Sequence, residues 1–309
     1  MYKRQAQAAT LGIHDARDLF GGVVPAPFVA TKAITHSLLA TSAYSPEGWS
    51  PAFTDLVRES VLEGFSVFTL ADAEAAGQLL LRQGPLRIKP VRATAGRGQL
   101  LVENLAGLKA GLAAQNPDEV AEYGLVLEEH LQAVITYSVG QVQIAERSIT
   151  YYGTQSLTQD NTGLWVYGGS DLVIARGGFA QLLVLTLPKA ARLAVAQAQI
   201  YDAAAQSCFD GFFASRRNYD IAQGLAADGT TRSGVLEQSW RIGGATSAEI
   251  AALQAFDSDP DLPAVRASSI ELHGAAQRLP PNAEVIFQGD DSEVGFISKL
   301  VRIEPYGNA

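Results

Sequence analysis

Residues 218–241 of the chain have the sequence NYDIAQGLAADGTTRSGVLEQSWR, and this stretch decides the fold. Its Asp228-Gly229 pair is a strong signal for a two-residue hairpin turn, because both residue types tolerate the left-handed backbone that such turns need. With the turn at this pair, two antiparallel strands face each other, and opposed residues have numbers with a constant sum. Asp220 is then predicted to lie directly opposite Glu237.

The two faces of this hairpin differ in chemistry, because side chains alternate between the faces of a strand. The polar face is predicted to carry the two carboxylates with Asn218, Ser239 and Arg241, and Asn218 lies opposite Ser239. The other face suits a hydrophobic core. It carries Tyr219, Ile221, Leu236 and Trp240.

The opposed carboxylates need a positive partner, because like charges directly opposite in a sheet are destabilising by up to about 1 kcal/mol. Mg²⁺ is a suitable partner, since it favours one or two carboxylates together with phosphate oxygens and water. Arg241 on the same face can hold a phosphate with its planar fork. The alternative is a solvated polar face on which Arg216 and Arg241 screen the acids.

A second phosphate signal is the loop ATAGRG at residues 93–98, which follows a short strand ending near Lys89. It is not a P-loop, because no Lys-Ser or Lys-Thr pair closes it, and it lacks the third glycine of the dinucleotide fingerprint. Small residues let backbone N–H groups approach phosphate oxygens closely. The loop therefore predicts a phosphate flap between two strands, with an ordinary surface hairpin as the alternative.

The bulk composition excludes several function classes. The net charge of -9 and pI near 5.0 argue against nucleic-acid binding and against attraction to an anionic membrane surface. The single cysteine, Cys208, rules out an intramolecular disulfide and a Cys-based zinc site. No secretory signal is visible, and the most apolar stretch, residues 179–187, is too short to span a bilayer. We expect a soluble, cytoplasmic protein; a homodimer is compatible with this composition.

The rest of the chain indicates an α+β protein with mainly antiparallel sheets rather than a regular βαβ series. Residues 1–31 are predicted to be loop-like. Thr69, Pro188 and Thr246 are predicted to start helices, Thr69 and Thr246 through capping boxes with Asp72 and Glu249. Strands are expected near residues 62–69, 86–89, 99–103, 125–131, 133–145, 148–154, 163–168, 171–175, 265–272, 283–288 and 294–304.

Three motifs, in their order along the chain, resemble the ATP-grasp superfamily. Ile88-Lys89-Pro90 with the loop Gly96-Arg97-Gly98 is similar to its phosphate strand and flap. Residues 126–131, VLEEHL, look like its hinge strand, and residues 236–241, LEQSWR, resemble its Glu-x-Asn-x-Arg signature. Lys32 stands where an earlier phosphate-binding lysine is expected. The stretch SWRIGGATSAE, residues 239–249, is most similar to an uncharacterised bacterial family of unknown function within that superfamily.

The resemblance implies an ATP-grasp fold in which two α+β lobes clasp ATP with Mg²⁺. It implies four groups of site residues. The phosphate groups contact Lys32, Lys89 and the loop with Gly96, Arg97 and Gly98; the nucleoside lies against Glu128, Glu129, His130 and Leu131; the metal is held by Asp220, Glu237, Ser239 and Asn218; and Arg241 with Lys89 acts on the transferring phosphoryl group.

Two features depart from the family pattern. Ser239 stands at the usual Asn of the signature, and Asn218, predicted opposite it, is a candidate source of the missing amide oxygen. The segment 1–31 is shorter than the domain that often comes first in this superfamily. We expect residues 32–124 to form the first lobe, residues 125–256 the second lobe with the metal site, and residues 257–309 the strands that complete it.

The resemblance implies a ligase that activates a carboxylate as an acyl phosphate for attack by an amine or another nucleophile, with an acceptor that the sequence does not identify. Two alternatives stay open. One is a kinase-like transfer of phosphate to a small molecule. The other is a nucleotide-binding regulatory protein without turnover, which Ser239 and the short N-terminal segment favour.

Overall fold

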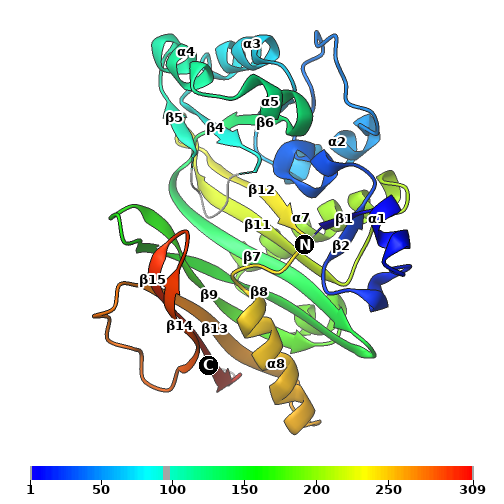
Figure 1. Ribbon diagram of the computed structural model, residues 1–309, viewed down its shortest axis with the longest axis vertical. Coiled ribbons are helices and arrows are strands. Elements are labelled where there is room, and N and C mark those ends of the chain that lie inside the picture. Colours follow the sequence, from blue (N-terminus) through cyan, green and yellow to red (C-terminus); the bar gives the residue numbers. More distant parts are fainter. Residues whose placement is uncertain (1, 93–97, 308–309) are drawn as a thin grey trace.

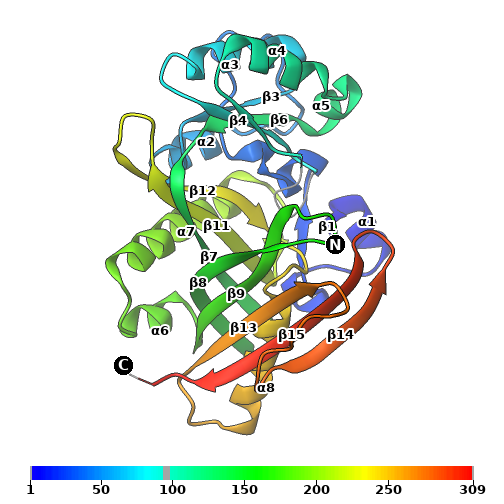
Figure 2. The ribbon, with the colours of Figure 1, turned by 90° about the vertical axis from the view of Figure 1, so that its left-hand side faces the viewer.

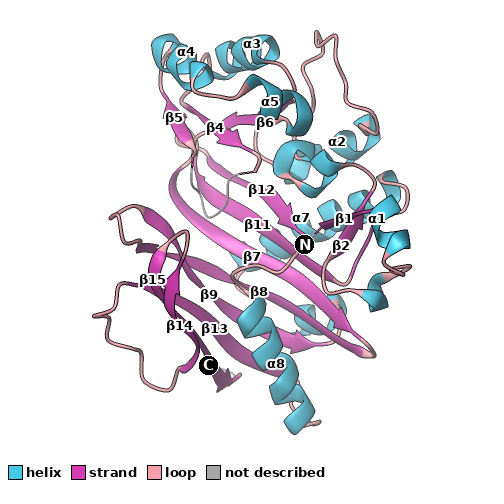
Figure 3. Ribbon diagram, in the orientation of Figure 1, coloured by secondary structure: helices cyan, strands magenta, loops and turns pink. Residues whose placement is uncertain are grey.

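The computed structural model describes residues 2–92 and 98–307. The chain forms a small lobe and a large lobe, and the small lobe lies above the large lobe in Figure 1. Both are built on antiparallel sheets with helices packed against them, as Figure 3 shows. The predicted α+β architecture with mainly antiparallel sheets is therefore confirmed.

The small lobe is a four-stranded antiparallel sheet in the order β3-β6-β4-β5. Its helices begin at side-chain caps; the Thr69 hydroxyl, for example, accepts from the backbone N–H of Asp72. The elements are β3 (Gly64–Val67), α3 (Leu70–Leu80), β4 (Leu86–Pro90), β5 (Leu100–Val102), α4 (Leu105–Ala113), α5 (Pro117–Tyr123) and β6 (Leu125–Glu129). The hinge strand β6 pairs within this sheet, so the chain crosses to the large lobe after residue 129, whereas a boundary at residue 125 was expected.

The large lobe is an eight-stranded antiparallel sheet in the order β12-β11-β7-β8-β9-β13-β15-β14, and Figure 2 shows it along its length. Its strands are β7 (Gln132–Ile144), β8 (Arg147–Gln159), β9 (Trp165–Arg176), β11 (Arg216–Leu225), β12 (Thr231–Ser239), β13 (Ala264–His273), β14 (Glu284–Asp291) and β15 (Gly295–Pro305). The two strands expected at residues 163–168 and 171–175 are one strand, β9. Since β12 is an edge strand next to the small lobe, the carboxylate hairpin lies at the junction of the lobes.

The long helices α7 (Lys189–Cys208) and α8 (Thr246–Ser258) cover opposite faces of this sheet. Val139 of β7 belongs to the core under α7, and Val142 of the same strand belongs to the core under α8. Residues three apart on a strand point to opposite faces. The shorter helices α2 (Pro51–Val57) and α6 (Phe179–Val184) complete the apolar layer on the α7 side. The opposite face of the large sheet carries α8 and also faces the small lobe.

The N-terminal segment is not loop-like, and the prediction for residues 1–31 is wrong. Residues 22–24 are buried as β2, which pairs with two short strands and so places an extra three-stranded sheet beside the large lobe. The three residues of β2 are too few to show the periodicity of a strand, so the sequence pattern did not predict this sheet. The elements here are β1 (Tyr2–Arg4), α1 (Gln5–Thr10), β2 (Gly22–Val24) and β10 (Phe213–Ala214), with 3₁₀ turns at Ala16–Asp18, Pro27–Ala30, Lys32–Ile34 and Arg58–Ser60.

The hairpin pairs Asp220 with Glu237 as predicted, but through a different turn. The backbone N–H of Ala226 donates to the carbonyl of Thr230 at 2.9 Å, so three residues, not two, lie between them. Gly229 takes the left-handed conformation in this turn, with φ of 80°. A three-residue turn alone would shift every opposed pair by one.

A β-bulge restores the register. Ile221 pairs with Val235, which leaves Leu236 as an extra residue on β12 before the Asp220–Glu237 pair. The bulge also moves Leu236 off the face on which it was predicted, and it packs instead against a small apolar cluster of Leu62, Leu131 and Ala222. Its side chain is half-buried and faces the space between the lobes, whereas Tyr219 is fully buried as predicted.

The chain crosses from the small to the large sheet between β6 and β7. Directly after the crossing, Ala133 has φ of 50°, a left-handed backbone that L-residues adopt at a cost of about 1–2 kcal/mol. No helix in the described part of the chain combines the length and hydropathy that a membrane crossing requires.

Candidate functional site

A cleft of about 1120 Å³ lies between the small sheet and the α8 face of the large sheet. This volume is at the upper end of ligand pockets, which are usually about 300–1,000 Å³, so a nucleotide and a second small molecule have room. Most of the predicted site residues line it: Lys32, Lys89, Glu128, Glu129, Leu131, Asn218, Asp220, Glu237, Ser239 and Arg241.

Three predicted loop residues and one hinge residue stand apart from this set. Gly96 and Arg97 lie outside the described residues, whereas Gly98 is described with φ of 69° and is followed by Gln99, which lines the cleft. His130 is not one of the lining residues. Its Nδ1 accepts from Nε of Arg87 at 3.1 Å, so its contact with the cleft is indirect, through the arginine.

Asp220 and Glu237 meet side by side on the cleft face of the hairpin. Burial and the neighbouring Glu237 raise the pKa of Asp220. Asp220 Oδ1 accepts from Ser138 Oγ at 3.2 Å and from Asn218 Nδ2 at 2.9 Å. The pair is therefore a concentrated negative centre that is held in place by polar neighbours.

Lys32 contacts this centre directly, with Nζ 2.6 Å from Glu237 Oε2. Thr31 caps the short turn that carries the lysine, since its hydroxyl accepts from the N–H of Ala33. Burial raises the pKa of Glu237, but Lys32 and other nearby cations lower it by a larger amount, so the net shift of the pKa is downward. A positive charge thus occupies the position next to the carboxylate pair.

A second lysine forms a buried ion pair in the small lobe. Lys89 Nζ contacts Glu128 Oε1, and His36 Nε2 lies 3.0 Å from Glu128 Oε2. Burial raises the pKa of Glu128, but Lys89 and His36 outweigh it and bring the pKa to about 2. The glutamate therefore fixes Lys89 at the cleft wall, and the buried His36 is its second partner.

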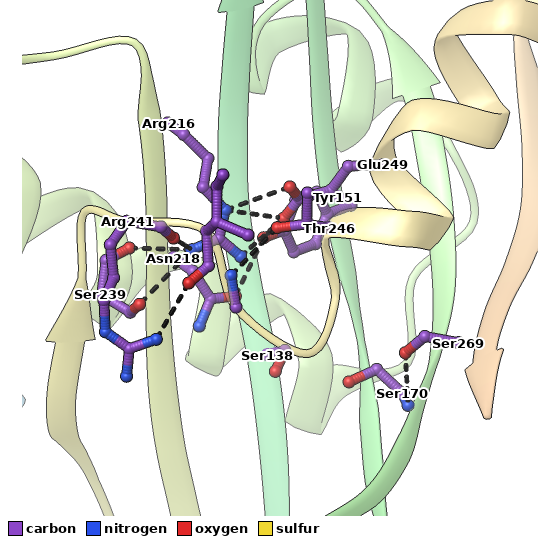
Figure 4. Close-up of polar contacts among 12 residues, drawn as sticks. Ser138, Tyr151, Ser170, Arg216, Asn218, Ser239, Arg241, Thr246, Glu249 and Ser269 are labelled. Carbon is purple, nitrogen blue, oxygen red and sulfur yellow. Dashed lines mark hydrogen bonds and ion pairs between the residues drawn. The ribbon is translucent and has the colours of Figure 1, made fainter. Parts of the chain in front are cut away.

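Ser239 and Asn218 lie next to a buried network that Figure 4 shows. Ser239 Oγ is 3.4 Å from Arg216 Nη1, and the Asn218 amide lies between Asp220 and the hydroxyl of Tyr151. Arg216 is fully buried and pairs with Glu249 of α8, Nη2 to Oε1 at 2.8 Å. Arg216 is therefore not a surface charge that screens the acids.

The partner of Glu249 overturns the capping box predicted for α8. Ala245 is the N-cap of this helix and gives it no side-chain cap, and Thr246 Oγ1 instead accepts from the N–H of Gly243. The carboxylate of Glu249 points to Arg216 and Tyr151. The buried ion pair with Arg216 therefore outweighs the local capping pattern at Glu249. The only signal for Arg216 in the sequence was the alternation that puts it on the polar face of β11.

The end of the cleft away from the small lobe combines polar and apolar side chains. Gln155 of β8 donates to Ser138 at 2.8 Å, and the Tyr167 hydroxyl shares a hydrogen bond with Ser170 Oγ at 2.7 Å. Leu157 and Trp165 line the cleft yet are 66% and 65% exposed. Such exposure of large apolar groups beside a cleft is typical of a surface that a ligand covers.

The donor set fits a magnesium ion that is shared with phosphate and does not fit a metal held by protein alone. Within residues 2–92 and 98–307, no group of three or more His, Cys, Asp or Glu side chains is close enough to hold a metal ion. The carboxylates of Asp220 and Glu237 would supply two oxygens, whereas the Asn218 amide presents its nitrogen to Asp220. Mg²⁺ commonly takes one or two carboxylates and completes its shell with phosphate oxygens and water.

Comparison with known proteins identifies the fold. The biotin carboxylase domain of 2-oxoglutarate carboxylase from Hydrogenobacter thermophilus, solved with MgADP, ADP and bicarbonate, is 12% identical with a TM-score of 0.53 over 83% of this chain. The chain spans 61% of that protein. Phosphoribosylamine–glycine ligase from Thermotoga maritima is 14% identical with a TM-score of 0.50, over 93% of this chain and 74% of that one.

A search of curated protein sequences gives no match. The two structures named above are ATP-grasp proteins, and this likeness shows that the chain has the ATP-grasp fold. A family model matches residues 2–301, and the chain belongs to that family, described as "Protein of unknown function (DUF3182)".

Proposed function

We propose that this protein is an ATP- and magnesium-dependent ligase that activates a carboxylate as an acyl phosphate. The observation that carries this proposal is the convergence of Lys32, Lys89, the Asp220–Glu237 pair and Arg241 on one cleft between the lobes. These side chains come from segments far apart in the chain. Two lysines, an arginine and two carboxylates fit a triphosphate with Mg²⁺ better than any uncharged ligand.

Each group has a defined task in this proposal. Lys89, fixed by Glu128, and Lys32 bind phosphate oxygens, and Arg241 stabilises the charge that develops on the transferring phosphoryl group. Asp220, Glu237 and Asn218 hold Mg²⁺, which when bound neutralises phosphate oxygens. Leu131 and the Glu128–Glu129 backbone line the nucleoside.

The reaction has two steps. A carboxylate oxygen of the substrate bonds to the γ-phosphorus of ATP while the bond from this phosphorus to the β,γ-bridging oxygen breaks, which gives an acyl phosphate and ADP. An amine or another nucleophile then bonds to the acyl carbon, inorganic phosphate leaves, and the nucleophile gives up a proton. No protein nucleophile is required, so the protein contributes position and charge.

We place the acceptor at the end of the cleft that Gln155, Tyr167 and Ser170 line. The exposed Leu157 and Trp165 at its mouth favour an acceptor with an apolar portion. The polar groups beside them suit the hydrogen-bonding part of the same molecule. The cytoplasmic location stays a prediction, and the homodimer stays a possibility that oligomeric-state measurements would decide.

Thermal unfolding with ATP, with and without MgCl₂, tests nucleotide binding. Bound ligand at a hundredfold excess over its dissociation constant should stabilise the protein by about 2.7 kcal/mol, and Lys89→Ala and Glu237→Ala should lose most of this. A library of carboxylic acids, amines and alcohols then tests catalysis, with ADP and product mass as readouts. An amide supports the ligase; a stable phosphoester from an alcohol would indicate a kinase.

A nucleotide-binding regulatory protein without turnover is the second candidate. Ser239 favours it, because a hydroxyl is a weaker magnesium ligand than the amide it replaces, and its Oγ is already next to Arg216. ATP-dependent stabilisation with no ADP release across the whole library would support this candidate over the ligase.

A further inference from the structure

A row of three residues crosses the large sheet beside the carboxylate pair. Asn218 of β11 pairs with Gly140 of β7, which in turn pairs with Tyr151 of β8. A Cβ atom on Gly140 would lie 2.4 Å from the Tyr151 ring, so the tyrosine lies flat across the glycine. The tyrosine thereby extends over a whole strand and brings its hydroxyl to the Asn218 amide.

The Tyr151 hydroxyl has two oxygen neighbours and a single proton. Asn218 Oδ1 is 2.9 Å away, and Glu249 Oε1 is 2.6 Å away. Arg216 holds Glu249 through Nε and Nη2, with Nε 3.0 Å from Oε2, so this carboxylate can only accept. The shorter, charge-assisted bond to Glu249 is the stronger one. The hydroxyl proton therefore goes to Glu249, and Asn218 Oδ1 faces the Tyr151 oxygen without a donor from it.

A half-turn of the Asn218 carboxamide removes this conflict. The nitrogen then donates to the Tyr151 oxygen, which still donates to Glu249, and Oδ1 faces Asp220 Oδ1 at the position where the nitrogen now lies, 2.9 Å away. Two acceptor oxygens at that separation repel each other unless a metal ion, or a proton on the carboxyl group, lies between them. The two orientations therefore differ in which ligand they suit.

We propose that Asn218 is a two-position ligand whose orientation is set by the buried chain Arg216–Glu249–Tyr151, and that Tyr151 is the positioning residue for the metal. Without a cation, the amide nitrogen donates to Asp220. With a cation, the amide turns and its oxygen binds the ion, while Tyr151 accepts from the nitrogen. This inference rests on the magnesium site of the proposed function and explains how Ser239 can replace an amide ligand in the signature.

Mn²⁺ serves as the probe in a double-variant test, with its binding measured by the loss of the free-ion paramagnetic resonance signal. Tyr151→Phe should weaken Mn²⁺ binding about tenfold, as removal of outer-shell partners commonly does. Asn218→Leu should weaken it at least as much. The combined variant should be no worse than Asn218→Leu alone, because Tyr151 acts only through Asn218.

The control is Tyr152→Phe, a half-buried tyrosine on the opposite face of the same strand, which should leave Mn²⁺ binding unchanged. A second readout is the side-chain amide NMR signal of Asn218, assigned with Asn218→Leu. Addition of Mg²⁺ should shift this signal in the wild type, as its partner changes from a carboxylate to a phenol, and should not shift it in the same way in Tyr151→Phe.

The outcomes separate this inference from the proposed function. Loss of Mn²⁺ binding in Glu237→Gln with unchanged binding in folded Tyr151→Phe would overturn the inference and keep the metal site. Additive losses in the combined variant would also overturn it, because Tyr151 would then act without Asn218. Mn²⁺ binding that is unaffected by Glu237→Gln and Asp220→Asn would remove the metal site itself.

Discussion

Lys32, in the 3₁₀ turn Lys32–Ile34, and Glu237 of β12 form an ion pair with 2.6 Å between Nζ and Oε2. The lysine is almost completely buried and the glutamate lies on an edge strand of the large sheet. Because Glu237 is also a proposed metal ligand, the lysine occupies the position next to it that a cation would take. We therefore expect Lys32 to oppose the binding of a metal ion alone and to favour the binding of a nucleotide.

Lys32→Met tests this competition. Mn²⁺ alone should bind several-fold more tightly to the variant, since Glu237 is freed, whereas ATP should bind more weakly because a phosphate contact is lost. Paramagnetic resonance titration measures the first and calorimetry the second. Lys299→Met frees Glu271, another carboxylate that lines the cleft, and should change neither. Weaker binding of both ligands to Lys32→Met would contradict the competition.

Glu128 should make the protein sensitive to acid. Its pKa is about 2 in the folded protein and near 4.5 in the unfolded chain, so its stabilising contribution is complete above pH 4.5 and is lost as the pH falls toward 2. The shift corresponds to about 3 kcal/mol. Urea unfolding between pH 5 and 2 should show a shallower loss of stability for Glu128→Gln than for the wild type. The exposed Glu122→Gln should follow the wild type; equal slopes for all three proteins would contradict the prediction.

The buried pair of Arg216 and Glu249 should couple strongly in stability. Removal of one partner leaves an uncompensated buried charge, so Arg216→Met or Glu249→Leu should each lower the free energy of unfolding by roughly 3–5 kcal/mol. The double variant leaves no unpaired charge and should recover most of this loss. Urea unfolding of the four proteins gives the coupling energy. Additive single-variant effects would show that the two charges do not depend on each other.

Two adjacent glycines allow a matched test of the acceptor end. A Cβ on Gly244 would lie 2.3 Å from the Tyr167 ring, whereas the nearest atoms to a Cβ on Gly243 are at 3.7 Å. Gly244→Ala should therefore displace Tyr167 and lower acceptor-dependent ADP release by about tenfold or more, with ATP affinity unchanged. Gly243→Ala should retain both. Weaker ATP binding in Gly244→Ala would mean that this loop belongs to the nucleotide end instead.

The sequence predicted the carboxylate pair through two errors that cancel. The turn at Asp228-Gly229 is one residue longer than predicted, and the bulge at Leu236 adds one residue to the other side. Alternation and turn chemistry describe single strands well, but a bulge depends on the neighbours of both strands. Here β12 also contacts the chain at Val61, through an isolated bridge to Val235 that no local pattern reveals.

Charge partners were the least predictable part of the site. Lys32 with Glu237, Lys89 with Glu128 and Arg216 with Glu249 are pairs between distant segments, and only the folded chain brings them together. The motifs named both members of the first two pairs without pairing them, whereas Arg216 was expected to screen the acids and Glu249 to cap α8. The three-stranded sheet of the N-terminal segment was missed for a related reason, because its short strands are defined by pairing with each other rather than by their own composition.

The left-handed backbone of Ala133 has a consequence for how the large sheet begins. Ala133 is the second residue of β7 and lies at the irregularity where Gln132 pairs with Leu225 and Ile135 with Gln223. Glycine takes this conformation without that cost. An Ala133→Gly exchange would relieve the strain but would also free the backbone at the start of β7, so a single methyl group both costs stability and restricts the conformations of the first residues after the crossing.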